Sequence, residues 1–150
     1  MSRSYGPLLR KALRALPESP RILEWGPGES TRIMLEERPA ARIVTIEHQR
    51  DFADAARVRF PRVHVVRCPI PVHGPSQYDA WPALRSCGGF DLVFVDGRRR
   101  VACLLTARHV VRSDGGVVLL HDCQRPEYKL GMELFHVEEI FQDTVWMELP

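Results

Sequence analysis

Residues 22–31 read Ile-Leu-Glu-Trp-Gly-Pro-Gly-Glu-Ser-Thr, an apolar run that breaks into a Gly-x-Gly turn. Because Gly26 and Gly28 carry no Cβ, the turn can be tight and a ligand can lie against its peptide planes. A second acid, Glu47, stands 21 positions after Gly26, at the end of the next apolar run. A nucleotide-binding βαβ unit places the acid that binds its ribose at about this spacing. The stretch therefore predicts a nucleoside-containing ligand at the first turn of an α/β sheet.

This turn departs from the dinucleotide-binding fingerprint in two ways. The third glycine of that fingerprint would fall at Thr31, and the first strand ends in an acid, Glu24. A pyrophosphate prefers a helix N-terminus without a neighbouring anion, whereas a carboxylate suits a ligand with a positive amino group. An NAD-dependent oxidoreductase is therefore the least favoured function.

Strand and helix patterns alternate outward from the turn. Strands are expected at 21–25, 42–47, 63–67, 90–96 and 117–121, and helices at about 30–38, 51–60 and 101–111. The strand segments are mostly apolar, as in strands covered on both faces. Their alternation with helices predicts an α/β fold, a three-layer sandwich around a doubly wound, mostly parallel sheet. Residues 135–141 and 145–149 predict a hairpin or two edge strands.

Length and composition indicate a single minimal domain over residues 1–150. The chain is 45% hydrophobic and 27% charged, which is enough to bury a core. Residues 1–19 contain a short amphipathic helix expected at 5–16, with a membrane-surface helix as the alternative. Residues 20–150 form the predicted core. The segment 69–89 lacks periodicity except for a short helix expected around 80–85.

Charge and targeting signals exclude several function classes. The net charge of +2 gives no reason to expect a polyanion, and no basic and aromatic stripe suggests nucleic acid. No apolar stretch is long enough for a bilayer, and no secretion signal is present, so a cytoplasmic protein without a membrane partner is expected. Four cysteines without a CxxC pattern argue against a zinc site or a disulfide framework.

The stretch Glu24-Trp-Gly-Pro-Gly-Glu-Ser-Thr31 resembles motif I of the class I SAM-dependent methyltransferases. Residues 90–97 (FDLVFVDG) and 115–122 (GGVVLLHD) resemble bacterial small-molecule O-methyltransferases. They are also similar to plant polysaccharide methyltransferases that act on glucuronic acid side groups. The resemblance covers about residues 20–150. It implies a Rossmann-like sheet that ends in an antiparallel strand pair, S-adenosylmethionine as cofactor, and O-methylation of a small acceptor.

The predicted cofactor site combines the glycine turn with polar residues at strand ends, which meet at one edge of a doubly wound sheet. Its candidates are Glu24, Trp25, Gly26, Gly28, Ser30, Thr31, Glu47, His48, Asp96 and Gly97. Glu47 is expected to accept hydrogen bonds from both ribose hydroxyls. For Trp25 and His48 packing is the alternative, and Ser30 and Thr31 can instead cap the following helix.

The resemblance places Asp96 beside the transferred methyl group, and His121 or Asp122 at the acceptor. An O-methyl acceptor loses a proton as it attacks, and a nearby His or Asp can take that proton as general base. A buried structural role is the alternative for His121. Arg98 and Arg125, with Tyr128 to orient the acceptor, favour an acidic substrate held by an Arg fork. A solvated charged surface is the alternative for the arginines.

A divalent metal is not expected. In catechol-type methyltransferases two acids at the positions of Asp96 and Asp122 hold magnesium together with an asparagine. The residue at that third position here is Cys123, a poor ligand for a hard cation. Because the chain is short, its acceptor site must come from the 69–89 segment, the N-terminal helix or a second subunit, as in a homodimer. A non-catalytic or partner-completed module that binds SAM or a nucleoside is the second hypothesis.

Overall fold

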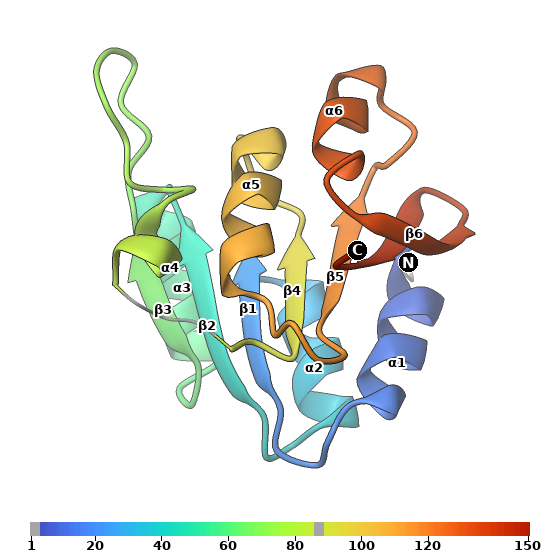
Figure 1. Ribbon diagram of the computed structural model, residues 1–150. Helices are drawn as coiled ribbons and strands as arrows, with labels where there is room; N and C mark the ends of the chain where they lie inside the picture. The colour runs from blue at the N-terminus through green and yellow to red at the C-terminus, as the bar shows by residue number, and fades with distance from the viewer. Residues whose placement is uncertain (1–3, 86–88) are drawn as a thin grey trace.

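The computed structural model describes residues 4–85 and 89–150, and in these residues a seven-stranded sheet lies between two layers of helices (Figure 1). The strand order is β3-β2-β1-β4-β5-β7-β6, with β1 to β5 parallel and β7 antiparallel to both of its neighbours. The strands are β1 (Arg21–Trp25), β2 (Arg42–Glu47), β3 (His64–Arg67), β4 (Leu92–Val95), β5 (Val117–His121), β6 (His136–Phe141) and β7 (Thr144–Glu148). The mostly parallel sheet with an antiparallel pair confirms the predicted fold class.

The order of the strands reverses beside β1. The chain runs from β1 outward to β2 and β3, and then returns to β4 on the other side of β1. Leu23 in β1 is in register with Val44 of β2 and Val93 of β4. Crossover connections leave in opposite directions from this point, and ligands of open α/β sheets bind there, beyond the carboxyl ends of the strands.

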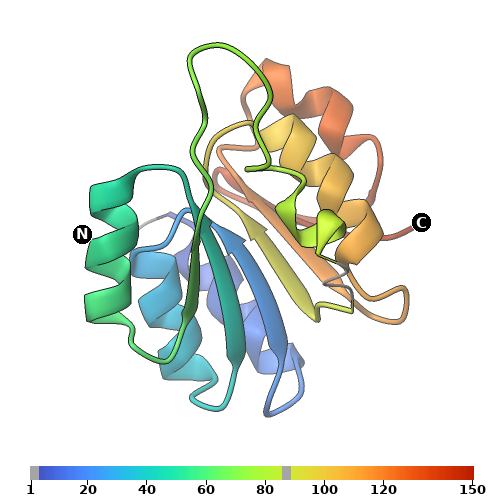
Figure 2. The same cartoon turned by 90° about the vertical axis from the view of Figure 1, so that its left-hand side faces the viewer.

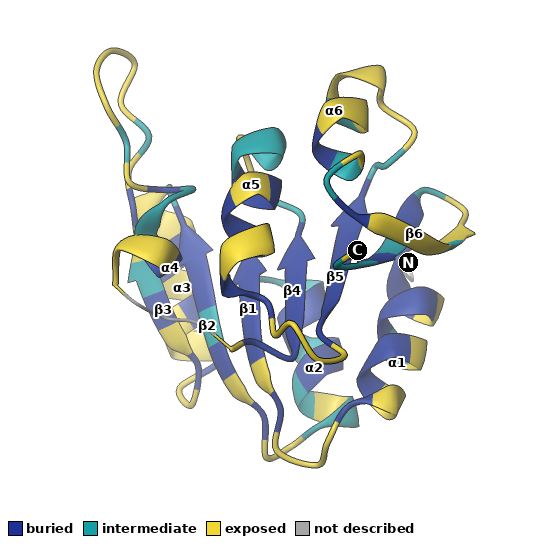
Figure 3. Ribbon diagram, viewed as in Figure 1, coloured by how far each residue is buried: buried dark blue, intermediate teal, exposed yellow. Residues whose placement is uncertain are grey.

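Helices cover both faces of the sheet (Figure 2). One face carries α1 (Gly6–Ala15), α2 (Glu29–Glu37) and α3 (Arg50–Arg59), and the other carries α4 (Trp81–Leu84), α5 (Arg100–Val110) and α6 (Lys129–Met132). Each face has its own apolar core, one around Leu9, Met34 and Phe94 and the other around Trp25, Leu104 and Phe135. The strands of the sheet centre are buried on both faces (Figure 3), which is why they lack polar alternation.

The N-terminal helix α1 packs against the domain. Its apolar residues Leu8, Leu9 and Leu13 are buried at the first core, while Arg10 and Arg14 form ion pairs with Glu37 of α2. The apolar face of α1, which suggested a membrane-surface helix, is therefore buried in the core of the domain. None of the helices in the described part of the chain has the length and apolarity needed to span a bilayer.

Residues 126–132 form two short helices that the sequence did not predict, the 3₁₀ helix η1 (Pro126–Tyr128) followed by α6. Each is too short to show periodicity. They pack on α5 because Gly131 allows a close approach: a Cβ there would lie 2.6 Å from Leu104 Cδ1. In the aperiodic segment the short helix α4 occurs at 81–84, and residues 86–88 of that segment lie outside the described residues.

Candidate active site

A cleft of about 940 Å³ lies at the carboxyl ends of the parallel strands. Its walls come from the glycine turn, the end of β2, the segment between β4 and α5, and η1. Residues of the predicted site that line it are Gly26, Gly28, Ser30, Glu47, His48, Asp96, Gly97, Arg98, Arg125 and Tyr128. Glu24, Trp25, Thr31, His121 and Asp122 lie outside this lining. Most of the predicted cofactor and acceptor residues are therefore brought to one cavity.

The glycine turn follows β1 directly. Gly26 has φ +92°, a conformation that glycine adopts without strain, and a Cβ there would lie 3.1 Å from the carbonyl oxygen of Asp96. Its N–H donates to Ile46 O across 3.1 Å. At Gly28 no atom lies within 4 Å of the Cβ position among the described residues. The turn thus fits closely against β2 and β4 and leaves open space over Gly28.

Glu24 lies beneath this turn and is fully buried. Its two carboxylate oxygens accept hydrogen bonds from the hydroxyls of Ser30 and Thr31, the latter at 2.7 Å. The Thr31 hydroxyl oxygen in turn accepts the Gly28 N–H at 3.0 Å. Burial raises the pKa of Glu24 from 4.5 to about 7, although the hydroxyls oppose the rise. Glu24 therefore ties the turn to the start of α2 instead of facing the cleft.

Trp25 packs behind Gly97, which lines the cleft. The Trp25 side chain is buried, and its Nε1 donates to the carbonyl oxygen of Tyr78 at 2.9 Å. The Tyr78 hydroxyl oxygen accepts the N–H of Arg98 at 3.1 Å. A Cβ on Gly97 would overlap that hydroxyl and lie 3.2 Å from Trp25 Cβ. Tyr78 thereby fixes the aperiodic segment to the sheet edge.

Glu47 forms the part of the cleft wall at the end of β2. It is 8% exposed, and its Oε1 accepts the backbone N–H of Gln49 at 2.8 Å. His48 Nδ1 lies 2.9 Å from the same oxygen, and its ring packs edge-on against Tyr78 with centroids 5.7 Å apart. The carboxylate is therefore held in one orientation beside the glycine turn.

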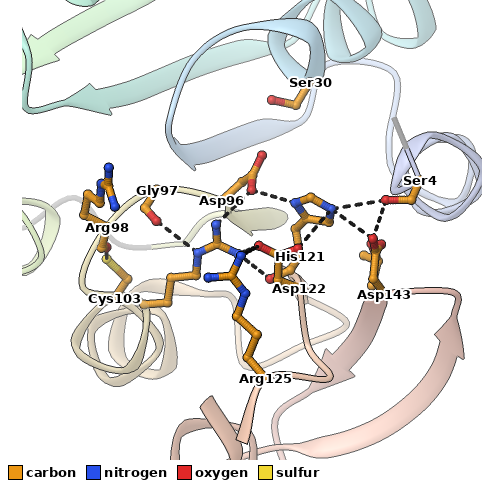
Figure 4. A network of polar contacts seen from close by, with 12 residues as sticks. Ser4, Ser30, Asp96, Gly97, Arg98, Cys103, His121, Asp122, Arg125 and Asp143 are labelled. Carbon is orange, nitrogen blue, oxygen red and sulfur yellow. Dashed lines mark hydrogen bonds and ion pairs between the residues drawn. The ribbon is translucent and has the colours of Figure 1, made fainter. Parts of the chain in front are cut away.

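A polar network connects the cleft to the chain termini (Figure 4). His121 Nδ1 lies 2.8 Å from Asp96 Oδ1. On its other side, His121 Nε2 lies 3.2 Å from Ser4 Oγ and 3.4 Å from Asp143 Oδ2. The Ser4 hydroxyl donates to Asp143 Oδ2 at 2.6 Å. The ring of Tyr5 packs edge-on against His121, with centroids 5.0 Å apart.

The hydrogen bonds of this network favour the charged imidazolium form of His121. The Ser4 proton is directed to Asp143, so the Ser4 oxygen accepts from His121 Nε2. Nδ1 faces a carboxylate oxygen of Asp96, so both ring nitrogens are donors. Burial alone would lower the pKa of His121, but the hydrogen bond to Asp96 and the charges of three surrounding aspartates outweigh it and raise that pKa. In the charged form the ring has no lone pair with which to accept the acceptor's proton.

The arginines near the cleft differ in their partners. Arg99 pairs with Asp79 at 2.6 Å, and Arg125 pairs with Asp122 at 3.1 Å. Arg100 is 10% exposed at its side chain and contacts both Asp96 and Asp122. Arg98 is exposed and lines the cleft, and its guanidinium forms no ion pair with any residue that the structure describes. Arg98 is thus the arginine of this group that is available to a ligand.

Several site residues carried no signal in the sequence. Ser4 and Tyr5 precede the first helix, Tyr78 lies in the aperiodic segment, and Asp143 lies in the β6–β7 turn. Each reaches the site through a contact between segments that are distant in the chain. Two positive φ values were likewise not predictable, at Arg99 (49°) and Asp122 (60°). Such conformations in residues other than glycine cluster at functional sites.

Solved structures with the same fold include several methyltransferases. A methyltransferase-like protein from Silicibacter pomeroyi has a TM-score of 0.79 and 23% identity, over 99% of this chain and 86% of that one. An O-methyltransferase from Bacillus cereus in complex with SAH has a TM-score of 0.73 and 18% identity, over 100% and 82%. A precorrin-6y C5,15-methyltransferase from Geobacter metallireducens has values of 0.68 and 15%, over 95% and 84%. At these identities the likeness shows the fold.

The family follows from the sequence comparison. A family model described as "Methyltransferase domain" matches residues 23–123, which is more than half of the chain. The chain belongs to this methyltransferase domain family. A comparison with curated protein sequences found no match. Family and fold together confirm the class I SAM-dependent methyltransferase resemblance, and they argue against the NAD-dependent oxidoreductase alternative.

Proposed function

We propose that the protein transfers a methyl group from S-adenosylmethionine to an oxygen of a small acceptor that carries an acidic group. The observation that supports this most strongly is that one cleft is lined by the glycine turn, by Glu47, by Asp96 and by Arg98. Its volume lies near the upper end of the range for ligand clefts, roughly 300–1,000 Å³. A nucleoside-containing donor and a small acceptor can therefore share it.

The cofactor half of the cleft is built from the turn and the end of β2. The backbone of Gly26 and Gly28 and the open space over Gly28 suit a ligand lying against the chain. Glu47, held by the Gln49 N–H, suits two ribose hydroxyls. Glu24 and Thr31 act as positioning residues for the turn. When bound, S-adenosylmethionine supplies a methyl group on a positively charged sulfur.

Asp96 is the proposed general base. As the acceptor oxygen attacks, a C–O bond forms and the C–S bond breaks, with its electron pair kept by sulfur. The acceptor proton passes to Asp96, which lines the cleft; a base placed in this way is worth roughly 10²–10⁴-fold in rate. His121 and Arg100 both contact Asp96 Oδ1, so they act as positioning residues that fix its orientation.

Arg98 is the proposed anchor of the acceptor. Its guanidinium suits a carboxylate, sulfate or phosphate because its donors form a planar fork. Arg125 and Tyr128 line the same cleft and complete the acceptor wall. An acidic acceptor thus places its anionic group at Arg98 and its hydroxyl toward Asp96.

The test is a methyl-transfer assay with labelled S-adenosylmethionine and pairs of acceptors. Each pair consists of a hydroxylated acid, such as a uronic acid or a hydroxybenzoate, and its neutral amide. We expect transfer to acids, and Arg98→Met should raise the KM for the acid by about tenfold, the value of one charged hydrogen bond, with little effect on the amide. Arg62→Met is the matched control, because Arg62 is an exposed arginine in the α3–β3 connection that donates to Pro39 O, away from the cleft.

Two results would contradict the proposal. Equal or better turnover of the neutral amides would contradict the proposal that the acceptor carries an acidic group. Binding of S-adenosylhomocysteine without transfer to any hydroxylated compound would favour the second hypothesis, a non-catalytic or partner-completed module.

A further inference from the structure

The guanidinium of Arg100 lies between the two carboxylates at the ends of β4 and β5. Its Nη2 is 3.2 Å from Asp96 Oδ1, and its Nη1 is 3.2 Å from Asp122 Oδ2. Nε donates to Gly97 O at 2.9 Å, and Nη1 also donates to the carbonyl oxygen of His121. The Tyr128 ring lies 5.3 Å from the guanidinium carbon. This buried cation is therefore fixed by contacts on several sides.

The network around Arg100 is nearly balanced in charge even without a charge on His121. Its three carboxylates face two guanidiniums, namely Asp96, Asp122 and Asp143 with Arg100 and Arg125. A divalent ion added to this half-buried set would leave an excess of positive charge, and unpaired charge is costly away from water.

The donor atoms of the two candidate metal sites are also engaged. Magnesium needs near-octahedral oxygen ligands at about 2.0–2.1 Å, but the carboxylates that would bind it in a metal-dependent relative face Arg100. The other cluster is His121, Asp122 and Asp143, with ligand atoms within 4.8 Å of one another. There Nε2 of His121 is already engaged, at 3.2 Å from Ser4 Oγ and 3.4 Å from Asp143 Oδ2. The residues present do not fit a divalent metal.

We infer that Arg100 is the resident cation of this site, so that the protein brings Asp96 and Asp122 together without a divalent metal. The inference rests on the proposed function only for the identity of the reaction. The side chain leaves from the first residue of α5 and reaches across to β5, so it joins the two strand ends as a bridging metal would. Arg100 is a positioning residue, because it reaches the reacting atoms through Asp96.

Manganese binding to the ligand-free protein tests this directly. Wild type is expected to show no saturable Mn²⁺ site. Arg100→Met keeps the aliphatic stem but removes the charge, and it should create a saturable site that binds Mn²⁺ at least about tenfold more tightly than any weak association with wild type, since two carboxylates are then available to the ion. Arg100→Met combined with Asp122→Asn should lose that site. Arg99→Met is the control, because it removes a neighbouring arginine that pairs with Asp79 instead.

A second set of measurements keeps the test decisive if Arg100→Met is unstable. Arg100→Lys retains a cation and should bind no Mn²⁺, and an unstable Arg100→Met protein should regain a melting transition when Mn²⁺ is added. A saturable wild-type site that Asp96→Asn or Asp122→Asn abolishes would overturn the inference, as would a folded Arg100→Met protein that binds no Mn²⁺. These results do not depend on finding an acceptor, so they stay separate from failure of the proposed function.

Discussion

His121 Nδ1 lies 2.8 Å from Asp96 Oδ1, and this contact joins the ends of β5 and β4 at the cleft. The opposite nitrogen is held by Ser4 and Asp143, from segments near the two ends of the chain. The imidazole ring is therefore fixed between an acid that lines the cleft, Asp96, and an acid that does not, Asp143. The arrangement supports the proposal that Asp96 is the base and that His121 is a positioning residue.

Replacement of His121 by Asn should change how stability depends on pH. The pKa of His121 is raised in the folded protein, so the stabilisation from its charge is fully present below the ordinary pKa of about 6.5 and is lost as the pH rises through the raised pKa. The gap in Tm between wild type and His121→Asn should be largest near about pH 6 and smaller at about pH 9. Thermal melts across this range measure the gap, and a gap that widens with pH would refute the charged form.

Replacement of Asp96 by Asn should separate chemistry from binding. We expect kcat to fall by about 10²–10⁴-fold, the usual value of a positioned base. The affinity for S-adenosylhomocysteine should change by less than about tenfold, because the proposed nucleoside contacts are at the glycine turn and Glu47. Asp114→Asn, at an exposed turn residue, is the control. An Asp96→Asn enzyme with full turnover would show that another group takes the proton.

Glu24 predicts a pH effect in a different window. Because burial raises its pKa from 4.5 to about 7, the folded protein binds this proton more tightly than the unfolded chain. Stability is then lost as the pH rises from about 4.5 to about 7, by about 3 kcal/mol at most. Glu24→Gln cannot titrate, so its stability relative to wild type should increase from about pH 5 to about pH 8. Denaturant unfolding at both pH values checks this, and an unchanged difference would contradict it.

Gly97 and Tyr78 should show coupled effects on stability. Gly97→Ala places a methyl group against the Tyr78 hydroxyl, and such overpacking costs about 1–3 kcal/mol. Tyr78→Phe removes that oxygen along with its hydrogen bond from Arg98 N. In the double variant the loss should be smaller than the two single losses together, by about 1 kcal/mol. Additive losses in a double-mutant cycle would show that the Trp25 contact, and not the hydroxyl, limits space at Gly97.

The sequence predicted the parts of the fold that depend on local patterns. Every strand was placed within about two residues, and the central ones were recognised because strands covered on both faces read as apolar runs. The turn at Gly26 and the acid at Glu47 were recognised from their spacing, and both line the cleft. What these residues bind stays a prediction, as does the homodimer.

The remaining parts of the site depend on contacts across the chain. Glu24 was expected to contact the ligand. In the structure it lies outside the cleft lining, where its carboxylate accepts hydrogen bonds from the hydroxyls of Ser30 and Thr31. Arg100 could not be told from Arg98 and Arg99 in a run of three arginines. The left-handed backbone at Arg99 and the start of α5 at Arg100 send these side chains in different directions. Arg99 pairs with Asp79, whereas Arg100 contacts Asp96 and Asp122.

The most direct test of this account is calorimetric titration of the purified protein with S-adenosylhomocysteine, alongside Glu47→Gln and the control Glu138→Gln on the exposed edge strand β6. We predict micromolar binding to wild type and to Glu138→Gln, and a loss of about 10–100-fold in Glu47→Gln, the value of one to two hydrogen bonds to a charged group. Binding of NADH in place of S-adenosylhomocysteine, or an affinity that Glu47→Gln leaves unchanged, would contradict a cofactor site at the glycine turn and Glu47.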